Sequence, residues 1–210
     1  MKRLLTYLIA IICIPALQSM ALTQKEQQAV IASINKSSMA IQSMSSNFTQ
    51  TKYLSLLSDK LVSEGKISYT RPDKLRWEYT SPYQYLFLFN GTKVYVGSKS
   101  KKEVIDTNTN KIFKEVARIM MSTVTGTALS NSSNFDISVS DANTAWKVTL
   151  VPKKKEMRSM FAKVILSFNK SNLQVSEIDI IEKNNDKTNI KFGKMIINQK
   201  IDASLFTIPK

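Results

Sequence analysis

Over most of this chain, from residue 47 onward, apolar side chains alternate with polar ones. Leu75, Trp77 and Tyr79, for example, are separated by charged residues. This period of two is typical of strands with one buried face. Segments with this pattern return between residues 135 and 197, and no helix-length segment interrupts them. The connections there are therefore short, which predicts antiparallel strands.

The alternation predicts about ten to eleven strands. A hairpin turn is indicated by Asn90 and Gly91, which lead into the strand segment Val94-Tyr95-Val96. Later strands are expected at 103–106, 135–139, 145–151, 161–169, 173–181 and 188–197.

Two segments instead have helical spacing. Thr23 and Glu26 form a capping-box pattern, and the apolar residues that follow predict a helix over 24–44. A second helix is expected over 109–122. Together the elements predict an α+β domain, in which helices cover one face of a half-open, strongly curved antiparallel β-barrel.

The first residues are expected to be removed. Lys2 and Arg3 precede an apolar run, and the small residues Ser19 and Ala21 stand where a signal peptidase reads. We expect a signal peptide over 1–21, cleaved after Ala21, and a mature domain over 22–210 in the periplasm. The alternatives are a short membrane anchor and lipid attachment at Cys13, which lacks the usual small residue before it.

The composition excludes several kinds of chemistry. The 210 residues include no histidine and one cysteine, so histidine-based triads, histidine metal ligands and internal disulfides are impossible. Glu177 and Asp179 share a strand face, as a glycosidase pair would, but two solvated carboxylates opposite the core-facing Ile178 and Ile180 explain them better. Asp136, Asp141 and Asn143 match no metal-binding loop. We expect no enzyme activity, no cofactor and no metal.

The charge is strongly basic. The sequence contains 30 Lys and Arg against 16 Asp and Glu. An exported protein meets little nucleic acid, so no nucleic-acid partner is expected. The surplus is interpreted either as steering toward an anionic membrane or acidic partner, or as solubility alone. The basic side chains gather in two clusters, which are Lys99, Lys101 and Lys102, and Lys153, Lys154, Lys155 and Arg158.

Aromatic residues gather on neighbouring predicted strands. They are explained either by an ordinary core or by a concave apolar face that holds a lipid. Methionines on the predicted helices favour the second reading slightly, since methionine adapts to variable apolar partners. The aromatic residues are Trp77, Tyr79, Tyr83, Tyr85, Phe87 and Phe89.

Four segments resemble one known family. Residues 65–82 read GKISYTRPDKLRWEYTSP, and 48–52, 90–93 and 202–209 read FTQTK, NGTK and DASLFTIP. These segments are similar to the signature strands, the hairpin and the closing motif of the LolA family. That family consists of periplasmic carriers of outer-membrane lipoproteins. The resemblance implies a half-barrel with a helical lid over an apolar cavity.

The resemblance also implies partners and site residues. It implies acylated lipoproteins as cargo, an inner-membrane ABC transporter as donor, and an outer-membrane acceptor or the membrane itself as the destination of a monomeric carrier. Arg71, followed by Pro72, matches the arginine that holds the lid shut, although an ordinary salt bridge would also explain it. The expected cavity lining is Leu75, Trp77, Tyr79, Tyr85, Phe87, Phe89, Ile112, Val116, Ile119 and Met120.

Two other functions are also compatible with the sequence. One is the transport of a different lipid or lipid-linked product. The other is a signalling or scaffold role, in which the same fold binds a protein partner and no lipid.

Overall fold

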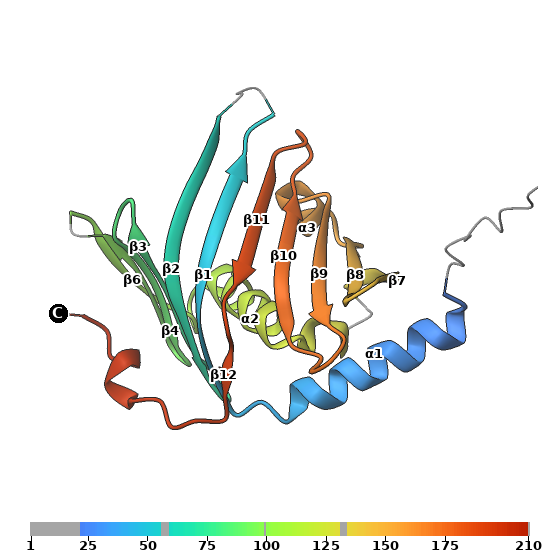
Figure 1. The fold of residues 1–210 in the computed structure, drawn as a ribbon. Helices are drawn as coiled ribbons and strands as arrows, with labels where there is room; N and C mark the ends of the chain where they lie inside the picture. Colours follow the sequence, from blue (N-terminus) through green and yellow to red (C-terminus); the bar gives the residue numbers. More distant parts are fainter. Residues whose placement is uncertain (1–21, 56–58, 99, 131–133, 210) are drawn as a thin grey trace, which may run out of the picture.

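The computed structural model describes residues 22–55, 59–98, 100–130 and 134–209. The expected signal peptide over 1–21, including Cys13, lies outside this part. Within the described residues, twelve strands form one sheet (Figure 1). The strands are β1 (Ser43–Tyr53), β2 (Lys60–Thr70), β3 (Lys74–Ser81), β4 (Tyr85–Asn90), β5 (Lys93–Ser98), β6 (Lys102–Asp106), β7 (Phe135–Ala142), β8 (Ala145–Pro152), β9 (Lys163–Asn169), β10 (Val175–Ile181), β11 (Lys187–Phe192) and β12 (Ile196–Ile197).

The sheet follows the chain closely. Its order is β6-β5-β4-β3-β2-β1-β11-β10-β9-β8-β7, and β12 pairs with β1. Every described pair is antiparallel. The strands β6 and β7 stand at opposite edges, so the sheet is open and does not close into a barrel. This confirms the half-open architecture predicted from the alternation.

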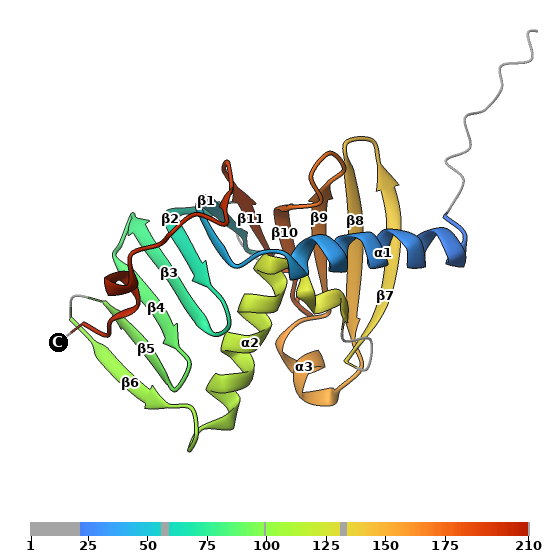
Figure 2. The ribbon, with the colours of Figure 1, turned by 90° about the horizontal axis from the view of Figure 1, so that it is seen from below.

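Three α-helices accompany the sheet, and they are α1 (Gln24–Met39), α2 (Lys111–Thr125) and α3 (Lys155–Met160). In Figure 2, α2 lies on the concave side of the curved sheet, and α1 crosses β9 and β8 and reaches the edge strand β7, where the Val139 amide donates to Gln27 Oε1 at 2.9 Å. Two short 3₁₀ helices, η1 (Thr127–Ser130) and η2 (Ala203–Phe206), complete the fold. The two long helices therefore cover the face that the sequence assigned to the core.

The first helix is shorter than predicted. Its capping box is present, since the Glu26 amide donates to Thr23 Oγ1 at 3.3 Å and the Thr23 amide donates to Glu26 Oε2 at 2.7 Å. The helix ends at Met39, however, and not at residue 44. Ile41 and Met44 are buried beyond its end, and Met44 belongs to β1. The spacing of three between Ile41 and Met44 suits a helix, but Met44 already lies in β1, where Met44, Ser46 and Phe48 are buried in the alternating pattern of a strand.

Other boundaries also differ from the prediction. The helix α2 starts at Lys111 and continues to Thr125, where Gly126 ends it in the left-handed conformation at φ 84°. The helix α3 was not predicted, because its six residues are mostly polar and too few to establish a period. The segment expected over 188–197 forms two strands, β11 and β12. The described residues thus contain one strand more than the largest number expected.

Two groups of buried side chains hold the sheet. The larger group lies on the concave side and includes Leu75, Leu166 and Phe168, all without exposed surface. The smaller group is formed by Leu86, Leu88 and Tyr95 together with Phe206 from η2. Leu86 and Leu88 lie on the face of β4 opposite to Phe87 and Phe89, as the alternation predicted. The C-terminal segment therefore covers the outer face of β4 and β5.

Candidate functional site

An apolar cavity of about 240 Å³ lies between the concave face of the sheet and α2. Strands β1, β3 and β7 to β11, the second half of α2, η1 and the segment after α3 all contribute to its wall. A larger hollow of about 490 Å³ lies at β1, β2 and β11, but exposed polar and charged side chains line most of it. The apolar cavity is lined by Gln50, Trp77, Tyr79, Ile119, Met120, Ser122, Thr123, Val124, Ala128, Phe135, Leu150, Phe161, Val164, Ile178, Ile180, Thr188 and Ile190.

The aromatic rings of Trp77 and Tyr79 form one side of the cavity, and Phe48 packs against both without lining it. The ring centroid of Phe48 lies 5.1 Å from that of Trp77 and 5.3 Å from that of Tyr79, with an edge-on arrangement toward Tyr79. Phe48 reaches this position because Gly65 has no side chain. A Cβ atom at Gly65 would overlap the Glu78 carbonyl oxygen and would lie 2.5 Å from Phe48 Cζ. This glycine therefore sets the position of the aromatic wall.

Polar groups in the wall are few. The Tyr79 hydroxyl donates to Gln50 Oε1 at 2.9 Å. Burial raises the pKa of Tyr79 to about 12, and the neighbouring Trp77 side chain opposes this shift. The Trp77 indole nitrogen is buried without a hydrogen-bond partner among the described residues. Because its pKa is raised, the Tyr79 phenol is protonated at neutral pH and acts as a hydrogen-bond donor.

The cavity brings together some of the predicted lining residues. Trp77 and Tyr79 line it from β3, and Ile119 and Met120 line it from α2. The remaining residues with described side chains, Leu75, Tyr85, Phe87 and Phe89, do not line it. Leu75, Phe87 and Phe89 are buried in the surrounding core, and Tyr85 is partly exposed, with its ring centroid 6.3 Å from that of Tyr79. The side chains of Ile112 and Val116 on α2 lie outside the described residues.

Part of the wall was not predicted from the sequence. Gln50 and Thr188 were overlooked because polar residues gave no signal for an apolar cavity. Both lie on strand faces whose alternation was visible, so their orientation could have been predicted. Phe135, Leu150, Phe161 and Val164 stand on predicted strand segments, but the alternation does not show which of them a helix leaves uncovered.

Arg71 lies in the turn between β2 and β3, at the end of α1. Its amide donates to the Gln42 carbonyl at 2.8 Å, and its Nη2 donates to the Ser38 carbonyl at 3.5 Å, the long limit of a hydrogen bond. Its Nε is buried and has no hydrogen-bond partner among the described residues. Burial raises the pKa of Tyr69, and the adjacent Arg71 guanidinium opposes that shift. Pro72 follows in the same turn and is exposed.

The two long helices meet at this end of the sheet. Ser38 in the last turn of α1 lies against Gly126, where an added Cβ would approach Ser38 Oγ to 2.6 Å. Arg71 therefore contacts the point at which the end of α1 packs on the end of α2. A change in the Arg71 hydrogen bond can act on both helices from this position.

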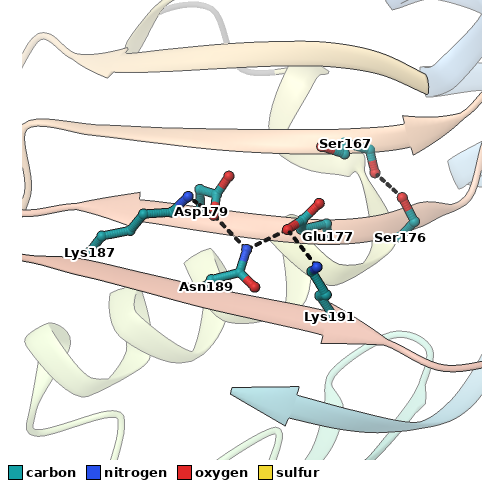
Figure 3. Close-up of polar contacts among 7 residues, drawn as sticks. All are labelled: Ser167, Ser176, Glu177, Asp179, Lys187, Asn189 and Lys191. Carbon is teal, nitrogen blue, oxygen red and sulfur yellow. Dashed lines mark hydrogen bonds and ion pairs between the residues drawn. The ribbon is translucent and has the colours of Figure 1, made fainter. Parts of the chain in front are cut away.

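The carboxylates of Glu177 and Asp179 on β10 form hydrogen bonds and ion pairs with their neighbours on β11, outside the cavity. The Asn189 amide donates to both Glu177 and Asp179, at 2.6 Å for Asp179, while Lys187 and Lys191 form ion pairs with them (Figure 3). Their strand neighbours Ile178 and Ile180 line the cavity, so the carboxylates lie on the opposite face. Asp179 is buried, and the reading of the pair as two solvated groups is therefore wrong for Asp179.

The remaining predicted polar candidates are also accounted for. Asp136 pairs with Lys153 at 3.1 Å, and Asp141 pairs with Lys170 at 2.6 Å. Within the described residues, no group of three or more histidine, cysteine, aspartate or glutamate side chains could hold a metal ion. The basic cluster at 153–158 lies at the start of α3, and Lys99 of the other cluster is outside the described residues. Among the described residues, no helix is both long and apolar enough to cross a membrane.

Comparison with known proteins identifies the family. The family model described as "Outer membrane lipoprotein carrier protein LolA" matches residues 39–209, and this chain therefore belongs to the LolA family. An outer-membrane lipoprotein carrier protein of Pseudomonas fluorescens is 24% identical over 205 residues, which cover 97% of this chain and 96% of the relative. The corresponding Pseudomonas aeruginosa protein is 26% identical, over 68% of this chain and 65% of its own length. The family is one of carriers.

Solved structures share the fold at low sequence identity. A conserved protein from Thermus thermophilus has a TM-score of 0.54 at 10% identity, with 87% of this chain and 94% of that chain covered. The complex of MucA and MucB from Pseudomonas aeruginosa gives 0.51 at 7% identity, over 86% of this chain and 60% of that chain. At such identities the likeness concerns the open, curved sheet and its helices alone.

Proposed function

We propose that this chain is a periplasmic carrier that binds the acyl chains of lipoproteins in the cavity beneath α2. It receives them from an ABC transporter in the inner membrane and delivers them to an acceptor on the outer membrane or to that membrane itself. The cavity, in a chain of the LolA family, is the observation that carries this proposal.

The chemistry of the wall supports an acyl ligand. Each CH₂ group moved from water into an apolar site contributes about 0.8 kcal/mol, so acyl chains do not cross an aqueous compartment unprotected. The wall offers the branched and aromatic side chains of Ile178, Ile190 and Phe161, among others. Polar groups stand in only a few places. A ligand that consists mostly of hydrocarbon fits this surface better than a sugar or a nucleotide.

The cavity must expand to accept such cargo. Its volume of about 240 Å³ lies below the roughly 300–1,000 Å³ of pockets that enclose drug-sized ligands. We propose that α2, which covers the cavity and ends at Gly126, is the part of the wall that moves. We propose that the described state is the closed, unloaded carrier.

We propose that Arg71 holds this closed state. Its hydrogen bond to Ser38 at 3.5 Å joins the β2–β3 turn to the meeting point of the two long helices. A hydrogen bond from a charged donor contributes about 1.5–3 kcal/mol, and a bond this long belongs at the low end. The burial of a few CH₂ groups offsets that amount, so acyl binding can open the carrier without trapping it. Pro72 shapes the turn that presents Arg71.

A lipoprotein-release assay tests this function. Spheroplasts that contain labelled lipoproteins are incubated with the mature chain, and the soluble fraction is analysed for acylated protein bound to it. Ile180→Lys places a charge in the cavity wall and should abolish release. The matched control is Ile196→Lys, at an exposed position on β12. No release by the folded wild-type chain, or equal release by both variants, would contradict the proposal.

A further inference from the structure

The cavity wall contains an arrangement of hydrogen-bond donors that the binding of hydrocarbon does not require. Four hydroxyl or amide side chains other than Tyr79 line the wall, and they are Gln50, Ser122, Thr123 and Thr188. The two hydroxyls on α2 both donate to the Ile119 carbonyl, at 3.0 Å from Ser122 and 2.7 Å from Thr123. Their protons are therefore used within the helix. The donors of Gln50 are not used in this way.

Tyr79 fixes the orientation of Gln50. Its hydroxyl donates to Gln50 Oε1 at 2.9 Å, so the amide oxygen faces the phenol and the amide nitrogen faces away. That nitrogen donates to no other described residue. Because burial raises the pKa of Tyr79 to about 12, the phenol keeps its proton and the orientation holds at neutral pH. Gln50 therefore offers two N–H groups to whatever enters the cavity.

A second unsatisfied donor lies beside the first. Trp77 is 5% exposed and lines the same cavity, and its indole nitrogen has no partner of normal hydrogen-bond geometry among the described residues; the indole lies near enough to the Tyr79 hydroxyl to lower its pKa. An indole can only donate. Among the buried side-chain atoms of the described wall, the one without a partner is therefore a donor, and the Gln50 amide nitrogen is a second donor without a described partner. This combination is complementary to a ligand group that only accepts hydrogen bonds.

We infer that Gln50 and Trp77 bind the carbonyl oxygen of an ester-linked acyl chain, and that Tyr79 positions Gln50 for this contact. The inference rests on the proposed function. An acyl ester has acceptor oxygens and no donor, and its hydrocarbon begins at the carbonyl carbon. Gln50 on β1 stands directly opposite Ile190 on β11, which in turn stands opposite Ile178 on β10, and all three line the cavity. A carbonyl held at Gln50 leaves the apolar wall free for the chain.

Two matched ligands test this contact. Methyl dodecanoate and methyl dodecyl ether have the same chain and differ only in the carbonyl group. Each is titrated against the mature protein loaded with the apolar dye N-phenylnaphthylamine, and the ratio of the two dissociation constants is measured. We expect the wild type to prefer the ester by about three- to tenfold, as one neutral hydrogen bond contributes.

Variants assign the preference to the named groups. Gln50→Leu should bring the ratio to about one, and Tyr79→Phe should lower it in part, because Gln50 then loses its fixed orientation. Gln84→Leu is the matched control, since Gln84 is exposed and lies outside the cavity. It should keep the wild-type ratio. Thermal unfolding of each variant verifies that the chain is folded.

The outcomes separate the inference from the proposed function. Binding of dye and of both ligands without preference, or an unchanged ratio in Gln50→Leu, would overturn the inference and leave an apolar carrier. Failure to bind dye or either ligand would contradict the cavity itself. A diacylglycerol and a diacylglyceryl-cysteine lipopeptide then compare free lipid with lipoprotein as the source of the ester. Gln50→Leu should weaken both by the same factor, and an effect on neither would refute the contact.

Discussion

Replacement of Gly65 by alanine tests whether the aromatic wall depends on the close approach of Phe48. Gly65 stands at a register shift between β2 and β3, and it is paired with Phe48 on β1. A methyl group there would overlap the Glu78 carbonyl oxygen and would lie 2.5 Å from Phe48 Cζ. One clash is with backbone, so rotation of a side chain alone cannot relieve it.

The magnitude follows from the cost of overpacking. An extra methyl group in a packed core costs about 1–3 kcal/mol, and the backbone clash places Gly65→Ala at the upper end. For a domain of this size each kcal/mol lowers the unfolding midpoint by about 2–4 °C. Displacement of Phe48 should also move Trp77, whose ring it contacts at 5.1 Å between centroids. We therefore expect a lower midpoint together with altered tryptophan fluorescence of the folded protein.

Calorimetry and fluorescence of two glycine variants provide the assay. Gly193→Ala is the control, because the nearest atom to its added Cβ is the Asn47 carbonyl oxygen at 3.6 Å, an ordinary contact. This variant should change the free energy of unfolding by less than about 1 kcal/mol. Equal midpoints for the two variants would refute the role assigned to Gly65.

Three further predictions concern individual side chains. Leu75→Ala should cost about 2–5 kcal/mol of unfolding free energy in urea titrations, whereas Val104→Ala, at a half-exposed edge position, should cost less than about 0.5 kcal/mol. The folded state keeps the Tyr79 proton up to a pKa of about 12, against 10.0 for the free group, so stability should fall between these pH values, and less steeply in Tyr79→Phe. Thr23→Ala removes the α1 cap and should cost about 1 kcal/mol, with faster amide exchange in its first turn. An unchanged exchange rate would contradict that role of Thr23.

The faces of the strands could be predicted from the sequence, because alternation fixes which side chains share a face. Leu75, Trp77 and Tyr79 lie together on the concave side, as expected, and Leu86 and Leu88 lie on the other. The position of the cavity along that face could not be predicted. It depends on which strand positions α2 leaves uncovered, and this is decided by packing between segments far apart in the sequence.

Some elements were mispredicted for local reasons. The end of α1 was placed too late because Ile41 and Met44 continue a helical spacing, although the chain has already entered β1. The short helix α3 gave no periodic signal. Gln50 was overlooked because its role depends on a hydrogen bond from Tyr79, which is 29 positions away in the sequence. Such a contact becomes visible only when β1 and β3 are brought together.

Native mass spectrometry of the mature protein, purified from its own periplasm beside an Arg71→Leu variant, tests the carrier function most directly. Loss of the hydrogen bond to Ser38 removes the contact that favours the closed state. We therefore predict acylated protein bound to a fraction of the wild type, and a larger loaded fraction in the variant because release is impaired. Free lipid as the sole ligand, or no ligand on either protein, would contradict the account.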